Sequence, residues 1–127
     1  MGHLILLTNN PLAASRFQDR ADVRYLDAGY KDILREARDL IHRGAVLLFH
    51  PLYGSVKPGE TPYRTLLLDV DTGRPIDIRS LDLIEAALRM CDAFADRSRL
   101  LDSKVLEDFQ KVDAANAESG FSGSPAQ

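Results

Sequence analysis

The sequence predicts a small α/β domain, a three-layer sandwich in which a four- or five-stranded, mostly parallel sheet carries helices on both faces. Two apolar runs, Leu4–Leu7 and Ala45–Phe49, are typical of strands that are covered on both faces. Segments of helical periodicity alternate with the strands, which favours right-handed crossovers between parallel neighbours. We therefore expect the first three strands to be parallel, with the two apolar runs adjacent at the centre of the sheet.

The first half of the chain is expected to alternate strands and helices. Asn10 is a suitable N-cap and Pro11 fits the first turn, so a helix is predicted from Pro11 to about Gln18. A shorter and more polar strand at residues 23–27 should lie farther out in the sheet. The helix that follows ends before Gly44, a typical C-terminal stop. Its apolar residues recur at helical spacing and predict one buried face: Tyr30, Ile33, Leu34, Ala37, Leu40 and Ile41.

The second half is expected to complete the sheet with a hairpin. Thr65–Val70 reads as a strand, and Pro75–Ile78 as a short edge strand after a turn, because proline donates no ladder hydrogen bond. Ser80 should then cap a helix over Leu81–Asp96.

A last helical segment follows, with an apolar stripe over residues 101–112, before a turn-rich tail. We expect one domain over residues 1–118 and a disordered tail over residues 119–127. The apolar residues of the preceding helix cover more than one of its faces. This predicts either a homodimer through the last two helices or a stripe that folds back over that surface.

Composition excludes several classes of protein. A net charge of -3 disfavours a nucleic-acid-binding protein, which usually carries a concentrated positive surface. The single cysteine, Cys91, can form neither an internal disulfide nor a Cys-x-x-Cys redox pair. The first apolar run is too short to span a bilayer and lacks a signal-peptide pattern. We expect a cytoplasmic protein with no membrane segment, no cofactor and no metal site.

The segment from His50 to Arg64 is the main functional candidate. Long loops are uncommon inside compact domains and are often functional, and this one is rich in prolines and polar side chains. Ligands in open α/β sheets bind beyond the carboxyl ends of the strands, where Asn9, Asp27 and His50 are expected. The sequence thus predicts one concave pocket for a small anion. Its expected lining residues are Asn9, His50, Ser55, Lys57, Thr61 and Arg64.

Several of these residues also have a simpler structural interpretation. His50 can be a half-buried structural histidine, Lys57 a solvated surface charge and Asn9 a turn residue. Cys91 lies among apolar helix residues and is expected to be structural. The glycine patterns of nucleotide-binding loops are absent from the sequence.

Two segments resemble the GrdX family, whose members are small proteins encoded beside the glycine, sarcosine and betaine reductase genes of anaerobic bacteria. They are Thr8-Asn9-Asn10-Pro11 and the whole string from His50 to Arg64, and the resemblance covers about residues 4–95. It implies a cytoplasmic accessory or regulatory role near amino-acid reduction and no particular activity.

Three hypotheses follow for the function. The first is a non-catalytic accessory or sensing protein that binds a small anion, such as a phosphate ester or an amino-acid derivative. The second is an enzyme in which His50 is the general acid or base, while Lys57 or Arg64 stabilises a developing negative charge. The third is a protein-interaction module.

Overall fold

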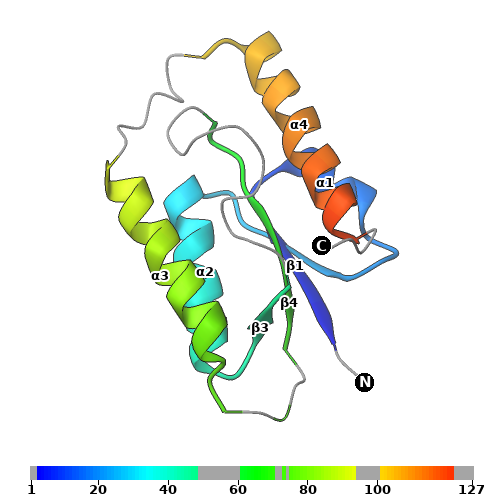
Figure 1. Cartoon of the computed structure of the whole chain (residues 1–127). Coiled ribbons are helices and arrows are strands. Elements are labelled where there is room, and N and C mark those ends of the chain that lie inside the picture. The colour runs from blue at the N-terminus through cyan, green and yellow to red at the C-terminus, as the bar shows by residue number, and fades with distance from the viewer. Residues whose placement is uncertain (1–2, 49–60, 71–72, 74, 94–100, 122–127) are drawn as a thin grey trace.

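The computed structural model describes residues 3–48, 61–70, 73, 75–93 and 101–121. These residues form a mixed α/β fold (Figure 1). The strands are β1 (Leu4–Thr8), β2 (Asp22–Tyr25), β3 (Val46–Leu47) and β4 (Thr65–Asp69). The helices are α1 (Pro11–Arg16), α2 (Tyr30–His42), α3 (Ile78–Ala93) and α4 (Ser103–Phe121).

The sheet is mixed, with the strand order β2-β1-β4-β3. Strand β1 is parallel to β2, whereas β4 is antiparallel to both β1 and β3. The expectation of a mostly parallel sheet with the two apolar runs side by side is therefore wrong, because β4 lies between them. The first three strands still point the same way, and the polar strand β2 lies at an edge as expected.

Strand β4 occupies the centre because it needs cover on both faces. Leu66, Leu67 and Leu68 are consecutive, so they alternate between the two faces of the sheet, and none is more than 4% exposed. A strand that is apolar on both faces loses this burial at an edge. Strand β3 is only two residues long and takes the edge instead, with Leu48 already 43% exposed.

The predicted edge strand at Pro75–Ile78 is also wrong, because helix α3 already begins at Ile78. Asp77 starts this helix: its Oδ2 accepts hydrogen bonds from the Ser80 backbone N–H (3.0 Å) and hydroxyl (2.6 Å). Ser80 is therefore not the N-cap. Its hydroxyl oxygen is buried and accepts a hydrogen bond from the backbone N–H of Leu47 (2.9 Å), which joins α3 to β3.

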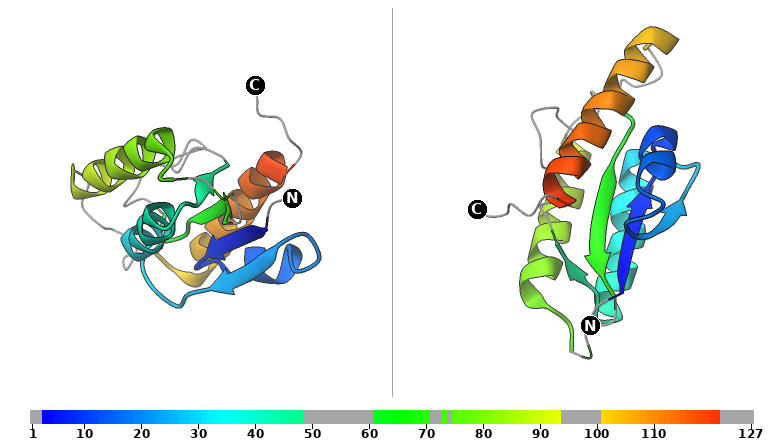
Figure 2. Two further views of the ribbon diagram at one scale, coloured as in Figure 1. Left: turned by 90° about the horizontal axis from the view of Figure 1, so that it is seen from below. Right: turned by 90° about the vertical axis from the view of Figure 1, so that its right-hand side faces the viewer.

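The helices cover both faces of the sheet (Figure 2). Leu66 and Leu68 pack in one cluster with residues of α2 and α3, while Leu67 packs in another with residues of α1 and α4. All six residues predicted for the inner face of α2 are buried. Gly44 follows α2 with a φ of 102°, a conformation that favours glycine, so the predicted stop is confirmed.

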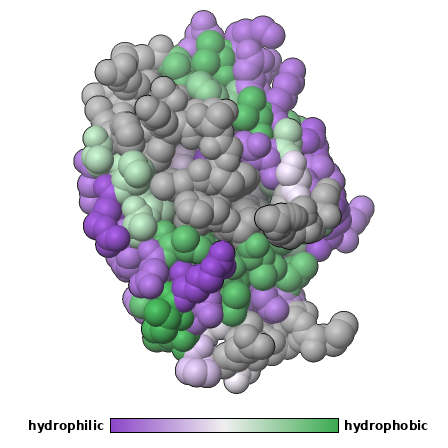
Figure 3. All heavy atoms as spheres, in the orientation of Figure 1, coloured by the Kyte–Doolittle hydropathy of each residue, from purple (hydrophilic) through white to green (hydrophobic). Residues whose placement is uncertain are grey.

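The described parts of the last two helices lie on opposite faces of the sheet and do not form one joint surface of the kind expected for the dimer. Helix α2, rather than the stripe on α4, covers the apolar side of α3. The right-hand edge of α4 in Figure 3 is mostly hydrophilic. A homodimer therefore stays a prediction, without the interface that motivated it.

Helix α4 continues beyond Glu118 into the expected tail. It ends at Phe121, whose ring stacks on that of buried Phe17 with centroids 5.0 Å apart. The guanidinium of Arg20 lies over the Phe121 ring and also pairs with Glu118. Among the described helices, none is both long and apolar enough to cross a membrane.

We predict that Asp77→Ala destabilises the fold more than Asp102→Ala, although both aspartates cap a helix. Asp102 Oδ1 accepts a hydrogen bond from Val105 N–H at the exposed start of α4, and such caps are worth about 1 kcal/mol. Asp77 in addition orients the Ser80 hydroxyl, which accepts the hydrogen bond from the buried backbone N–H of Leu47. Loss of Asp77 should therefore lower the free energy of unfolding by roughly 1–3 kcal/mol more. Urea denaturation of both variants measures the difference, and equal losses would contradict the role assigned to Ser80.

Candidate functional site

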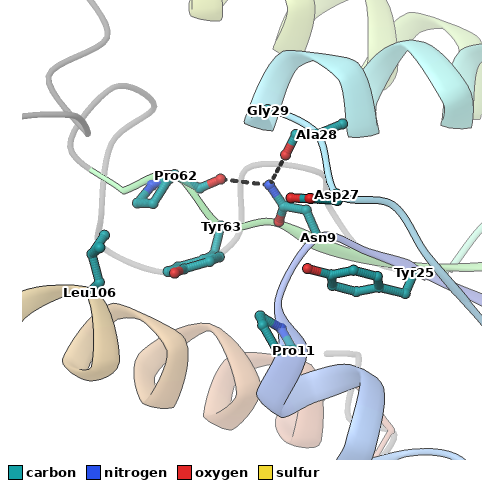
Figure 4. A pocket seen from close by; sticks show the side chains of 9 residues that line it. All are labelled: Asn9, Pro11, Tyr25, Asp27, Ala28, Gly29, Pro62, Tyr63 and Leu106. Atoms are coloured by element: carbon teal, nitrogen blue, oxygen red, sulfur yellow. Dashed lines mark hydrogen bonds between the residues drawn. The ribbon is translucent and has the colours of Figure 1, made fainter. Parts of the chain in front are cut away.

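Asn9 lies at the carboxyl end of β1 and joins three segments that are distant in sequence. Its Nδ2 donates hydrogen bonds to the carbonyl oxygens of Ala28 (2.8 Å) and Pro62 (2.7 Å). Its Oδ1 accepts a hydrogen bond from the Arg64 backbone N–H (2.9 Å). The end of the first strand, the start of α2 and the segment just before β4 therefore meet at one side chain (Figure 4).

A pocket of about 510 Å³ opens beside Asn9, within the usual size range of small-molecule sites. Because β1 and β2 are parallel, their carboxyl ends both reach this rim of the sheet. We call it the rim pocket. Its described lining residues are Asn9, Pro11, Tyr25, Asp27, Ala28, Gly29, Pro62, Tyr63 and Leu106 (Figure 4).

The chemistry of the rim pocket comes from one carboxylate, two tyrosines and a helix end. Asp27 is the only charged side chain among the described lining residues. Tyr25 is 45% exposed, and Tyr63 stands on the other side of Asn9 (Figure 4). Gly29 precedes α2, and the amino end of a helix carries a partial positive charge. The polar atoms of Asn9 are already bonded within the protein, so Asn9 shapes the pocket.

A second, much smaller pocket of about 10 Å³ lies between the start of β4 and α4. We call it the α4 pocket, and its described lining residues are Thr61, Tyr63, Arg64, Phe109, Val112, Asp113 and Asn116. Arg64 is 3% exposed, and its guanidinium lies 5.0 Å from the ring centroid of Tyr30. Burial raises the pKa of Tyr30, an effect that the positive charge of Arg64 partly opposes.

The structure places the predicted site residues in three groups. Asn9 lines the rim pocket, whereas Thr61 and Arg64 line the α4 pocket. The backbone bond from Arg64 to Asn9 does bring these segments together. His50, Ser55 and Lys57 lie outside the described residues, so their place in a site stays a prediction.

Apart from Asn9 and Asp27, none of the described residues that line the rim pocket was selected from the sequence, and Tyr25 and Leu106 are two examples. Tyr25 lies at the end of β2, where the strand-end rule that had already placed Asp27 on this rim could have found it. Leu106 comes from α4, and no local pattern in the sequence connects that helix to the strand ends.

A buried polar network beneath the pockets attaches α4 to the sheet. The hydroxyl of Thr65 donates to Asp113 Oδ2 (2.6 Å) and lies 2.7 Å from the hydroxyl of Thr8. Asn10 Nδ2 donates to the same Asp113 oxygen (2.9 Å) and to the Gln110 carbonyl oxygen (2.9 Å). Asn10 Oδ1 also accepts from Leu12 N–H, which confirms the predicted N-cap of α1.

The other candidate groups offer little chemistry in the described part of the chain. Cys91 is half-buried, and desolvation raises the pKa of its thiol, with nearby Lys31 partly opposing the shift. A raised pKa makes the reactive thiolate scarce at neutral pH. Within the described ranges, no three His, Cys, Asp or Glu side chains gather as metal ligands would.

We predict that Asn9→Ala lowers the free energy of unfolding by about 1–3 kcal/mol, because partners in two other segments, among them the buried N–H of Arg64, lose their hydrogen bonds. Asn116→Ala is the matched control. Asn116 lies in helix α4, half-buried, and alanine favours helices, so we expect a change within about 0.5 kcal/mol. Chemical denaturation followed by circular dichroism compares the two, and a stable Asn9→Ala variant would contradict the role given to Asn9.

Comparison with known proteins agrees with the resemblance seen in the sequence. Residues 5–121 match the family model described as GrdX-like protein. No curated protein and no solved structure matches the chain. The match includes both pockets, every described helix and all but the first residue of the sheet. The chain therefore belongs to the GrdX-like protein family.

Proposed function

We propose that this protein is a non-catalytic binding or sensing protein whose rim pocket holds a small molecule with both a positive and a negative group, such as an amino-acid derivative. The observation that carries the proposal is the pairing of Asp27 with the amino end of α2 in one pocket. A ligand with a single charge would satisfy one of these features and conflict with the other.

The positive group of the ligand has suitable partners in Asp27 and the two tyrosines. A carboxylate attracts an ammonium group directly. Tyr25 and Tyr63 add aromatic rings, whose faces attract cations, including fully substituted ammonium groups. The exposure of Asp27 leaves its carboxylate accessible to a ligand.

The negative group of the ligand fits the amino end of α2, where the helix dipole favours anions. It would share this end with the carboxylate of Asp32, which already accepts a hydrogen bond from the Gly29 N–H (3.0 Å). A phosphate ester is less suitable, because the carboxylate of Asp27 would repel its two negative charges. Of the ligands considered from the sequence, this favours the amino-acid derivative. His50, Ser55 and Lys57 are proposed as further contacts of the same ligand.

The proposed biological role is an accessory one in the cytoplasm, near amino-acid reduction. The resemblance to proteins encoded with glycine, sarcosine and betaine reductase genes suggests this setting. Binding of an amino-acid-like molecule is an activity that such a role would need. Binding is favoured over catalysis because the described lining offers a single exposed carboxylate and no hydrogen-bonded acid–base pair.

We predict that glycine or betaine raises the melting temperature of the protein, whereas acetate and ethylamine at the same concentration do not. Each of the latter carries only one of the two charges. A ligand at one hundred times its dissociation constant adds about 2.7 kcal/mol of stability, which a thermal-shift assay detects easily. An equal response to acetate or inorganic phosphate would instead support a simple anion site.

Asp27→Asn tests the proposed ammonium contact. It should weaken glycine binding about tenfold, since a hydrogen bond to a charged group is worth roughly 1.5–3 kcal/mol, while leaving the exposed site folded. Betaine has no N–H on its ammonium group, so its binding should weaken only through the lost attraction between opposite charges. Asp39→Asn, an exposed change on α2 outside the rim pocket, is the control and should bind like the parent. Unchanged calorimetric affinity in Asp27→Asn would reject the proposed orientation of the ligand.

A further inference from the structure

Tyr63 links the rim pocket to helix α4. Its side chain lines both the rim pocket and the α4 pocket, and its hydroxyl accepts a hydrogen bond from Gln110 Nε2 of α4 (2.9 Å). Tyr63 lies before β4, outside the hydrogen-bonded ladder of the sheet. Among the described residues, the hydrogen bond from Gln110 is therefore the polar contact that holds the hydroxyl end of the Tyr63 ring in place.

Gln110 is itself held in place from the opposite side. Asn10, which is fully buried, donates to the Gln110 carbonyl oxygen (2.9 Å) and, with the same nitrogen, to Asp113 Oδ2 (2.9 Å). Gln110 and Asp113 are three residues apart, so they lie on the same side of α4. These two hydrogen bonds fix the position and the rotation of α4 at Gln110 relative to the end of β1.

We propose that Gln110 is a positioning residue for the rim pocket: it holds Tyr63 as a pocket wall, so that the docking of α4 sets the affinity for ligand. The inference rests on the proposed function of that pocket. Leu106, one turn before Gln110, lines the same pocket directly. Helix α4 therefore contributes to the site twice, once by contact and once through Tyr63.

The test compares Gln110→Leu with Gln110→Glu. Leucine removes the hydrogen bond, whereas a glutamate carboxylate can accept one from the Tyr63 hydroxyl and keep the ring in place. The probe is glycine or betaine, whichever binds the parent more tightly, and affinity is measured by calorimetry well below the melting temperature. Gln18→Leu, an exposed change near α1, is the matched control.

Gln110→Leu should weaken binding about tenfold, the equivalent of one hydrogen bond of about 1.4 kcal/mol. Gln110→Glu should recover most of the affinity, and Gln18→Leu should bind like the parent. Tyr63→Phe should weaken binding to a similar degree, and adding Gln110→Leu to it should have little further effect. Parental affinity in Gln110→Leu, equal weakness in Gln110→Glu or additive losses would overturn the inference.

A measurement without ligand separates this inference from the proposed function. NMR of protein with labelled tyrosine rings reports on Tyr63 directly, and Gln110→Leu should shift its ring signals far more than those of Tyr25. If the parent binds neither glycine nor betaine, the proposed function fails. The spectrum then still shows whether Gln110 holds the ring of Tyr63 in place. An unchanged Tyr63 signal in Gln110→Leu would overturn it.

Discussion

The fold depends on two consecutive asparagines at the end of β1. Asn9 binds backbone groups at the start of α2 and in the segment just before β4, whereas Asn10 caps α1 and holds α4. Neighbouring residues at a strand end project to opposite sides, so the pair serves both faces of the sheet. Asn9 is 6% exposed and Asn10 fully buried, which makes their hydrogen bonds with protein groups obligatory.

The contribution of the two asparagines to stability depends on the groups that they bind as much as on the asparagines themselves. A single neutral hydrogen bond adds only about 1 kcal/mol, but a buried donor or acceptor left without a partner costs roughly 1–3 kcal/mol. Fully bonded polar networks also favour one arrangement over its alternatives. The asparagine pair therefore fixes where α2, α4 and the segment before β4 meet, and this meeting point is the rim pocket.

The parts of the fold that depend on local chemistry could be predicted from the sequence. Helix α2 followed from its periodicity and Gly44, and α1 from Asn10 and Pro11. The central position of β4 could not be predicted, because an apolar sequence pattern does not indicate whether a strand is parallel or antiparallel to its neighbours. The assumption of a hairpin with residues 75–78 also favoured a position near the edge of the sheet. Asp77 was missed as a cap because Ser80 offered an equally good local signal, and only the burial of Ser80 against β3 separates them.

The candidate site was predictable to a similar extent. The strand-end rule brought Asn9, Asp27 and the end of the loop to one rim, because parallel β1 and β2 finish at the same edge. It could not show that Arg64 lines the α4 pocket or that its guanidinium lies over the ring of Tyr30. It also could not find Leu106 and Gln110, whose role depends on how α4 docks and not on any pattern near them in sequence.

The most direct test of the role of the asparagine pair is native-state hydrogen exchange at the backbone amide of Arg64. This amide lies just before β4 and donates to Asn9 Oδ1 at 2.9 Å. If the asparagines hold the strand ends together, it should exchange as slowly as the amides in the middle of β4, by opening only when the domain unfolds. Exchange as fast as in an open loop, with β4 still protected, would contradict the account.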